Sequence, residues 1–416
     1  MHRFRFTRRL PAAAVAALAM AAAGAARPAD ALAAPLQAPA ADSIDYARLN
    51  PHRGLGDCLA DTAVDTICRV RKGWTAGELR ARLDAGHALS RDGGELTFAY
   101  RGEARGVELG GGIQGPLSRL VGTDLWVLTV RVPRLDEAMV SYFFIPNTGG
   151  DPRGRRFVPQ RWTGPLAPPL PDTSAALAGR IIRDSIRSRH LGAWRGVTVY
   201  VPPAVGTRPV AGVVFMGDGA AADAMGKAID PLIAAGRLPR VLLVGMHADT
   251  VRGPRPEDDG RAAEYLTGFL DGDTRFLAHE RFVVDEVLPW AEAAYDVPRE
   301  AARRAVFGFS NSAAFALQMG LRHPGRFGRV LAFSPAGADA AVESATTPER
   351  AAAFYLLGGI LEPAFHQKAV AWAEVFRPLG IRHVLREPVA GHDWAMWQTY
   401  FPDALAWAFG GEADGS

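Results

Sequence analysis

The sequence predicts an all-β module followed by an α/β domain with a mainly parallel sheet. The chain has 416 residues, 48% of them hydrophobic and 22% charged, so it can bury a substantial core and is too long for one average domain. Residues 95–145 show the two-residue alternation of strands, interrupted by glycines. After residue 172, continuous apolar runs alternate with helical stretches, which is typical of a parallel sheet covered by helices on both faces.

The first 33 residues have the composition of an export signal. Four arginines within residues 1–10 precede an alanine-rich apolar stretch, and residues 31–33 form a small-residue cleavage site. We therefore expect a periplasmic or secreted protein with no transmembrane segment in the mature chain. An uncleaved anchor is the alternative, and the arginine pair at residues 8–9 leaves the general and the twin-arginine export routes both open.

The predicted leader also distorts the net charge. The whole chain has a formal charge of +3, but 42 basic and 43 acidic side chains remain once residues 1–33 are removed. A near-neutral chain without a basic run offers little to a phosphate backbone, so we expect no nucleic acid partner.

The β module is predicted over residues 45–150. Within residues 123–132 (TDLWVLTVRV) both faces of the strand are largely apolar, so both need cover, as in a sandwich. We expect its two cysteines, Cys58 and Cys68, to form a disulfide because export brings them to an oxidising compartment. Two free core thiols are the alternative. Zinc is disfavoured, since two thiolates without nearby histidines leave a tetrahedral ligand set incomplete.

A proline-rich connector separates the two architectures. Seven prolines fall within residues 146–172, and we predict a linker over 151–172. The α/β domain then spans residues 173–411. Its expected strands lie at residues 197–202, 210–216, 240–246, 304–310, 329–335 and 351–359.

Residues 305–324 (AVFGFSNSAAFALQMGLRHP) carry the strongest chemical signal. A β-like run ends at Gly308, Ser310 lies in the turn, and a helix begins at once. A serine in such an elbow projects its hydroxyl above the carboxyl edge of the sheet, and small residues are needed two positions before and after it. Gly308 and Ser312 meet that need, which makes Ser310 the candidate nucleophile.

A nucleophilic serine needs a general base and an acid that orients the base. Glu362 and His392 each follow an apolar run, so both lie at carboxyl ends of expected strands, where open α/β sheets place their sites. We expect neutral His392 to take the Ser310 proton while Glu362 fixes the tautomer and stabilises the imidazolium.

The developing oxyanion requires backbone N–H donors. One donor is normally the residue after the nucleophile, here Asn311, and the other comes from the loop after a central strand. We assign the second donor to Ala220, because VVFMGDGA ends an apolar run in a glycine-flanked turn.

Several neighbouring side chains receive other interpretations. Asp339 is the alternative acid of the triad, and Asp393 is expected to cap the final helix. Trp394 and Trp397 follow the candidate histidine and could wall a pocket for an aryl group, but core positions are the favoured interpretation. Arg261, with Arg252 and Arg255, could meet an anionic substrate, but solvated ion pairs with the acidic run at residues 257–259 are the favoured interpretation.

Several segments together resemble the enterochelin esterase-like, or esterase D-like, branch of the α/β-hydrolases. They are FGFSNSAAFA with RHPGRFGRVLAFSP behind it, FVVDEVLPWAEAAYDV ahead of it, LLGGILEP, and GHDWAMWQTYFPDALAWAF. The resemblance extends from Arg180 to Phe409. It implies an α/β-hydrolase fold, and the preceding β module resembles the immunoglobulin-like N-terminal domain of enterochelin esterases.

The resemblance also implies residue roles. Ser310 matches the family nucleophile, Glu362 its acid, His392 its histidine, and residues 218–220 its oxyanion loop. Ser312 departs from the family, which has glycine at that position.

The expected function is therefore that of an exported serine hydrolase of carboxylic esters that needs no metal or organic cofactor. Its partner would be a small-molecule or glycan-linked ester. The resemblance implies catecholate siderophore trilactones of the enterochelin type as possible substrates. Feruloyl or acetyl esters on polysaccharide side chains are the alternative, and a catalytically inactive surface binding protein on a hydrolase scaffold is a third hypothesis.

Overall fold

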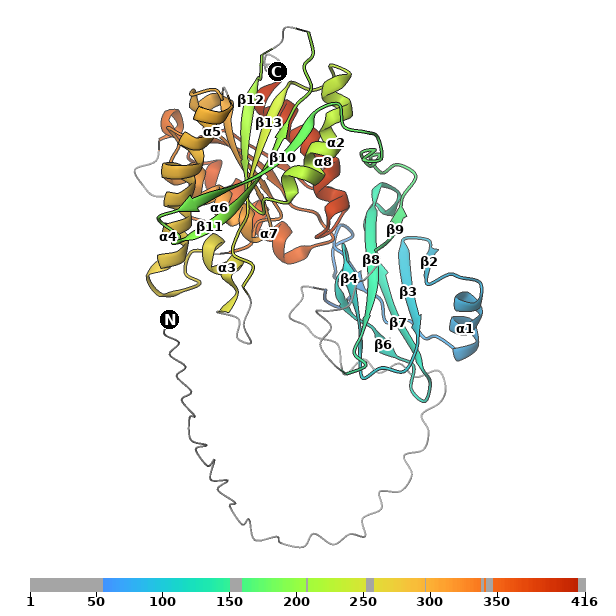
Figure 1. Cartoon of the computed structure of the whole chain (residues 1–416). Helices are drawn as coiled ribbons and strands as arrows, with labels where there is room; N and C mark the ends of the chain where they lie inside the picture. The colour runs from blue at the N-terminus through green and yellow to red at the C-terminus, as the bar shows by residue number, and fades with distance from the viewer. Residues whose placement is uncertain are drawn as a thin grey trace, which may run out of the picture.

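The computed structural model describes residues 55–149, 159–206, 209–251, 258–295, 297–337, 340–341 and 347–410. The predicted leader, residues 1–33, lies outside these ranges. Figure 1 shows two bodies, an N-terminal β sandwich and a larger α/β domain, side by side. Within the described residues, no helix combines the length and apolarity that a membrane crossing requires.

The β sandwich consists of two antiparallel sheets, as the alternation of residues 95–145 predicts. The first sheet has the order β1-β7-β3-β2, with β6 paired to β7, and comprises β1 (Cys68–Arg69), β2 (Leu89–Asp92), β3 (Glu95–Arg101), β6 (Ser118–Arg119) and β7 (Leu125–Arg131). The second has the order β5-β4-β8-β9 and comprises β4 (Val107–Gly111), β5 (Gly115–Pro116), β8 (Met139–Pro146) and β9 (Gln160–Thr163). Buried apolar side chains from both inner faces form its core. The more specific expectation of an immunoglobulin-like domain stays a prediction.

Two local features of the sandwich follow from its sequence. The helix α1 (Ala76–Asp84) begins with a capping box, in which Thr75 and Glu78 satisfy each other's backbone N–H groups. Cys58 and Cys68 are joined as a disulfide, with Cα atoms 5.0 Å apart.

The predicted linker over 151–172 contains an edge strand. Strand β9 lies between Pro159 and Pro165 and pairs with β8. An edge strand uses only one side for hydrogen bonding, so it tolerates flanking prolines that a central strand would not. The linker interpretation was therefore wrong for residues 160–163.

The α/β domain is built on one eight-stranded sheet with the order β10-β11-β13-β12-β14-β15-β16-β17. The sheet is mainly parallel, as predicted, and its six parallel strands are β12 (Gly212–Met216), β13 (Val241–Met246), β14 (Arg304–Phe309), β15 (Arg329–Phe333), β16 (Ala353–Leu357) and β17 (His383–Arg386). Five of them match expected strands, whereas the expected strand at residues 197–202 belongs to the antiparallel β11. The hairpin β10 (Arg180–Ser188) and β11 (Ala193–Val201) adds two antiparallel strands at one edge.

Helices cover both faces of this sheet. The first face packs against α2 (Ala221–Ala234) and α8 (Trp394–Phe409). The second packs against α3 (Gly260–Tyr265), α4 (Thr274–Arg281), the π-helical turn η6 (Phe282–Val287), α5 (Leu288–Ala294), α6 (Asn311–Arg322) and α7 (Pro363–Phe376). Two buried apolar cores result, which explains why the strands are continuous apolar runs.

The topology brings the candidate residues to one edge. The parallel strands β12, β14, β16 and β17 end just before Asp218, Ser310, Glu362 and His392 respectively. Carboxyl ends of parallel strands meet at the same edge of a sheet, where α/β folds place their sites.

Candidate active site

Ser310 lies in a sharp turn between β14 and α6. Its backbone is in the left-handed region, with φ 58° and ψ −125°, which is unusual for a residue other than glycine. Its N–H donates to the Phe333 carbonyl at 3.0 Å. A Cβ on Gly308 would lie 2.0 Å from the Ser312 carbonyl oxygen, so strand and helix approach too closely for a side chain there. This is the geometry of a nucleophile elbow, as the sequence predicts.

Ser312 connects the elbow to the neighbouring loop. Its Oγ accepts from the Phe309 N–H at 3.0 Å and lies 2.8 Å from Asp218 Oδ2 and 2.9 Å from the Phe309 carbonyl, either of which can take its single proton. The side chain is fully buried. The serine in place of the family glycine thus leaves the elbow intact and adds a polar link to residue 218.

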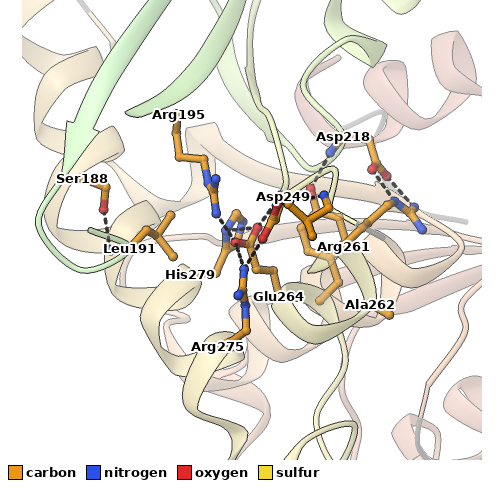
Figure 2. Close-up of polar contacts among 12 residues, drawn as sticks. Ser188, Leu191, Arg195, Asp218, Asp249, Arg261, Ala262, Glu264, Arg275 and His279 are labelled. Carbon is orange, nitrogen blue, oxygen red and sulfur yellow. Dashed lines mark hydrogen bonds and ion pairs between the residues drawn. The ribbon is translucent and has the colours of Figure 1, made fainter. Parts of the chain in front are cut away.

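Asp218 lies in the predicted oxyanion loop and is held from several sides. Arg261 binds its carboxylate with two hydrogen bonds, Nε to Oδ1 at 2.5 Å and Nη2 to Oδ2 at 2.7 Å, and Figure 2 shows the two groups facing each other. Its N–H donates to the Tyr265 hydroxyl at 2.7 Å, and its φ is 54°. The bonded partner of Arg261 is therefore one that the sequence interpretation did not name, a carboxylate 43 positions away in the sequence.

The two predicted oxyanion donors lie at helix N-termini. Ala220 is the N-cap of α2, and Asn311 is the first residue of α6. N–H groups in the first turn of a helix have no acceptor within the helix. Both groups are therefore placed where they can donate to a substrate oxygen, and their role stays a prediction.

His392 and Glu362 form a direct pair. Nδ1 of His392 donates to Oε2 of Glu362 at 2.6 Å, and Glu362 is only 5% exposed. The other carboxylate oxygen accepts from the Ser334 hydroxyl at 2.6 Å and from the Gly359 N–H at 2.8 Å. Ser334 in turn accepts from Trp397 Nε1 at 2.9 Å. These bonds fix the orientation of the carboxylate, which is what the acid of a triad requires.

Aromatic rings surround the imidazole. The Phe365 ring stacks on His392 with centroids 3.9 Å apart, and Trp397 contacts it edge-on at 5.0 Å. Trp397 also stacks on Phe309, the residue before Ser310, at 4.4 Å. A continuous set of packed rings therefore links the histidine to the nucleophile elbow.

The next residue, Asp393, caps α8 as predicted. Its Oδ1 accepts from the N–H groups of Ala395 and Met396. Burial of this carboxyl raises its pKa, although its bonds to the N–H groups of Met396 and Ala395 and the neighbouring Ser141 of β8 act in the opposite direction. The alternative acid, Asp339, lies outside the described residues.

A hollow of about 260 Å³ opens above the predicted oxyanion loop. Residues 218–221 and 247–250 line it together with Arg261, Phe309 and Trp394. Trp394 is 41% exposed, whereas Trp397 is only 5% exposed. The expectation of a core position thus holds for Trp397 and is wrong for Trp394, because the first turn of α8 turns that ring toward the hollow.

A polar network lies behind this loop. Glu264, on α3, is fully buried and binds Arg195, Arg275 and the N–H of Asp249 (Figure 2). Burial acts to raise the pKa of Glu264, but hydrogen bonding and charge from His279, the Asp249 N–H and the charge of Arg195 outweigh it and lower the pKa to about 2. Within the described residues, no group of three or more His, Cys, Asp or Glu side chains is arranged to hold a metal ion.

Sequence reasoning missed Ser334, Glu264 and the partner of Arg261. Ser334 carried a usable signal, since it directly follows the apolar run that forms β15 and so lies at the same edge of the sheet. No comparable signal marks Glu264, whose partners come from three separate segments.

Comparisons with known proteins bear on the family and the fold. The family described as "Putative esterase" matches residues 188–408. The enterobactin esterase FES from Shigella flexneri, in the presence of 2,3-di-hydroxy-N-benzoyl-serine, is similar at 20% identity with a TM-score of 0.56, covering 77% of this chain and 95% of that one. The ferric enterobactin esterase from Salmonella typhimurium is similar at 20% identity and a TM-score of 0.56, covering 77% and 96%. None of the curated proteins matches the chain. At these identities the structural likeness concerns the fold.

Proposed function

We propose that this chain, which belongs to the esterase family in its enterochelin esterase-like branch and is a carboxylic ester hydrolase, cleaves its esters through Ser310, His392 and Glu362. The observation that carries the proposal is the 2.6 Å bond from His392 Nδ1 to a buried and fully bonded Glu362. This bond fixes the histidine tautomer with its other nitrogen free to accept a proton. Ser310 supports the proposal through its strained elbow at the same edge of the sheet.

The proposed reaction proceeds by acyl transfer. His392 takes the proton of Ser310 as the hydroxyl oxygen attacks the ester carbonyl carbon, and the N–H groups of Ala220 and Asn311 stabilise the oxyanion. His392 then protonates the departing alcohol, which leaves an acyl-enzyme. A water molecule, deprotonated by the same imidazole, hydrolyses this intermediate and restores Ser310.

The substrate that we propose is an ester with an aromatic group, of the catecholate siderophore class. Support comes from the enterobactin esterases of similar fold and from the exposed face of Trp394 beside Phe309, where an aryl ring can pack. We further propose that the enzyme acts in the periplasm or outside the cell, as the composition of residues 1–33 suggests.

The test combines a substrate panel with an active-site probe. We expect the purified protein to hydrolyse aryl or catechol-lactone esters and to react with a fluorophosphonate. Ser310→Ala should lower kcat by at least about 10⁴-fold and abolish labelling. Ser185→Ala, an exposed serine on β10, is the matched control and should keep full activity.

The panel also separates the alternatives. Release of acetate or ferulate from xylan without cleavage of a catechol trilactone would favour a polysaccharide esterase. A wild-type protein that neither hydrolyses any ester nor takes up the probe would instead be a binding protein on a hydrolase scaffold.

A further inference from the structure

We propose that the β sandwich is a working part of the active site, in which the turn at Gly112 positions the loop that carries His392. This inference rests on the proposed function of His392. The loop in question is residues 387–393, which connects β17 to α8. Three independent contacts, described in turn below, link the sandwich to this loop.

The first contact is a backbone link. The N–H of Met139, at the start of β8, donates to the Val389 carbonyl at 2.9 Å, and Met139 and Ala390 form a parallel β-bridge. The Met139 side chain is 1% exposed and packs in the core of the α/β domain beside Ala390, Met396 and Trp397. The sandwich thus contributes both a hydrogen bond and a core residue to the histidine loop.

The second contact lies directly beside His392. A Cβ on Gly391 would lie 1.7 Å from the Gly112 carbonyl oxygen, and a Cβ on Gly112 would lie 2.6 Å from Oδ2 of Asp393. The Gly112 turn therefore touches the residues on both sides of the histidine. Backbones can approach this closely only because both positions are glycine.

The third contact reaches the loop that carries the acid. Leu361 and Val389 are each 2% exposed and belong to the hydrophobic core of the sandwich. Leu361 directly precedes Glu362, and its N–H donates to the Ala390 carbonyl at 3.0 Å. The histidine loop consequently lies between the sandwich on one side and the acid loop on the other.

These contacts imply that the β sandwich positions His392, because proton transfer requires short distances between donor and acceptor atoms. The bond between His392 and Glu362 is 2.6 Å long, and the imidazole must also face Ser310. A displacement of about 1 Å can cost an enzyme a factor of about 100 in rate. A side chain that pushes the loop from the sandwich side should thus impair catalysis although it lies about 280 positions from His392 in the sequence.

The experiment introduces that side chain in the full-length protein. In Gly112→Ala the new methyl group meets Asp393 Oδ2, whereas its contacts with Ser141 are ordinary at 3.5 Å. We expect kcat to fall about 10-fold to 100-fold with little change in KM. Gly106→Ala is the matched control, since it lies in the same domain and its Cβ would meet nothing within 4 Å.

A spectroscopic readout separates positioning from general damage. The His392 Nδ1 proton, shared with Glu362 at 2.6 Å, should give a downfield proton resonance that His392→Gln removes. We expect this resonance to shift in Gly112→Ala and to stay in place in Gly106→Ala. If Gly112 had a merely structural role, Gly112→Ala would lower the melting temperature without moving this resonance.

A second substitution tests the route of the effect. Asp393→Ser removes Oδ2 but keeps a side-chain oxygen that can cap α8. Gly112→Ala should therefore cost much less kcat in the Asp393→Ser background than in the wild type. An equal cost in both backgrounds, or a kcat for Gly112→Ala equal to that of Gly106→Ala, would overturn the inference. Failure of the proposed function would give a different result. Either Ser310→Ala would be as active as the wild type, or the wild type would hydrolyse no ester at all.

Discussion

The two halves of the candidate site are held in different ways. On the nucleophile side, charged and polar side chains join separate loops: Ser312 and Arg261 bind Asp218, and Glu264 binds Arg195 and the Asp249 N–H. On the histidine side, hydrogen bonds from Ser334 and the Gly359 N–H hold the Glu362 carboxylate, whereas the loop that carries His392 is held by backbone contacts and packing from the β sandwich.

This difference predicts different sensitivities. Buried ion pairs with several hydrogen bonds respond strongly to the removal of one charge, because the remaining charge is left without a partner in a poorly solvated place. Close contacts between backbones respond to added volume instead, since a protein interior has no free space for an extra methyl group. Charge substitutions should thus damage the nucleophile side, and volume substitutions the loop that carries His392.

The largest effect is expected for Glu264→Gln. The amide keeps the shape of the side chain but leaves Arg195 without a carboxylate partner, whereas Arg275 keeps its ion pair with Asp249. Breaking a buried pair in this way typically costs about 3–5 kcal/mol. We therefore expect urea unfolding at pH 7 to show a loss of that size in the free energy of unfolding.

Acid offers an independent check on Glu264. Its pKa is lowered from 4.5 to about 2, so the carboxylate stabilises the fold above pH 4.5 and that contribution is lost as the pH falls toward 2. The difference in unfolding free energy between wild type and Glu264→Gln should shrink across this range. Glu300→Gln, which alters a largely exposed glutamate 3.9 Å from Arg303, is the control and should change nothing measurable. If the difference in unfolding free energy between wild type and Glu264→Gln did not change with pH, the lowered pKa of Glu264 would be contradicted.

Ser312→Ala should have a smaller effect, felt mainly in catalysis. The change removes the link between the elbow and Asp218 and leaves the buried Phe309 N–H without its acceptor. We expect a loss of about 1–2 kcal/mol in stability and about 10-fold in kcat, with KM nearly unchanged. The measurement is steady-state kinetics beside thermal unfolding.

A buried serine elsewhere serves as the control for Ser312. Ser188 is 1% exposed and accepts the Leu191 N–H at 3.0 Å at the end of β10 (Figure 2). Ser188→Ala should lower stability by a similar amount without lowering kcat. Equal kcat values for the two variants would mean that the Ser312 hydroxyl supports the fold alone.

The sequence could predict the candidate catalytic residues themselves better than the residues that support them. The elbow at Ser310 was visible because its requirement for small neighbours lies within five residues. Glu362 and His392 were visible because each follows an apolar strand, and parallel strands bring their carboxyl ends to one edge. Their 2.6 Å bond agrees with that argument.

The supports of the site could not be predicted in this way. Arg261 has acidic residues close by in the sequence, yet its partner Asp218 is brought to it by the order of the strands. Gly112 lies in a glycine-rich segment, residues 110–115, that carries no chemical signal of its own. Its contact with Gly391 depends on how two domains pack, and no local pattern encodes that packing.

The smallest effect, and one of opposite sign, is expected for Asp393→Asn on the histidine side. Burial raises the pKa of Asp393 from 3.8, so the protonated form stabilises the fold at low pH and this stabilisation is lost as the pH rises through the folded-state pKa. At pH 7 the charged carboxylate is buried, and the cost of that burial outweighs its hydrogen bonds to Met396, Ala395 and Ser141, whereas an asparagine caps α8 equally well without the charge.

We accordingly expect Asp393→Asn to raise the melting temperature at pH 7 by about 2 °C, with a smaller gain at pH 4. Thermal unfolding at the two pH values measures this, with Asp259→Asn at the N-cap of α3 as the matched capping control, which should show no such pH-dependent gain. A lower melting temperature at pH 7 would mean that the loop that carries His392 also depends on a charge. The contrast between a nucleophile side held by ion pairs and a histidine loop held by packing would then fail.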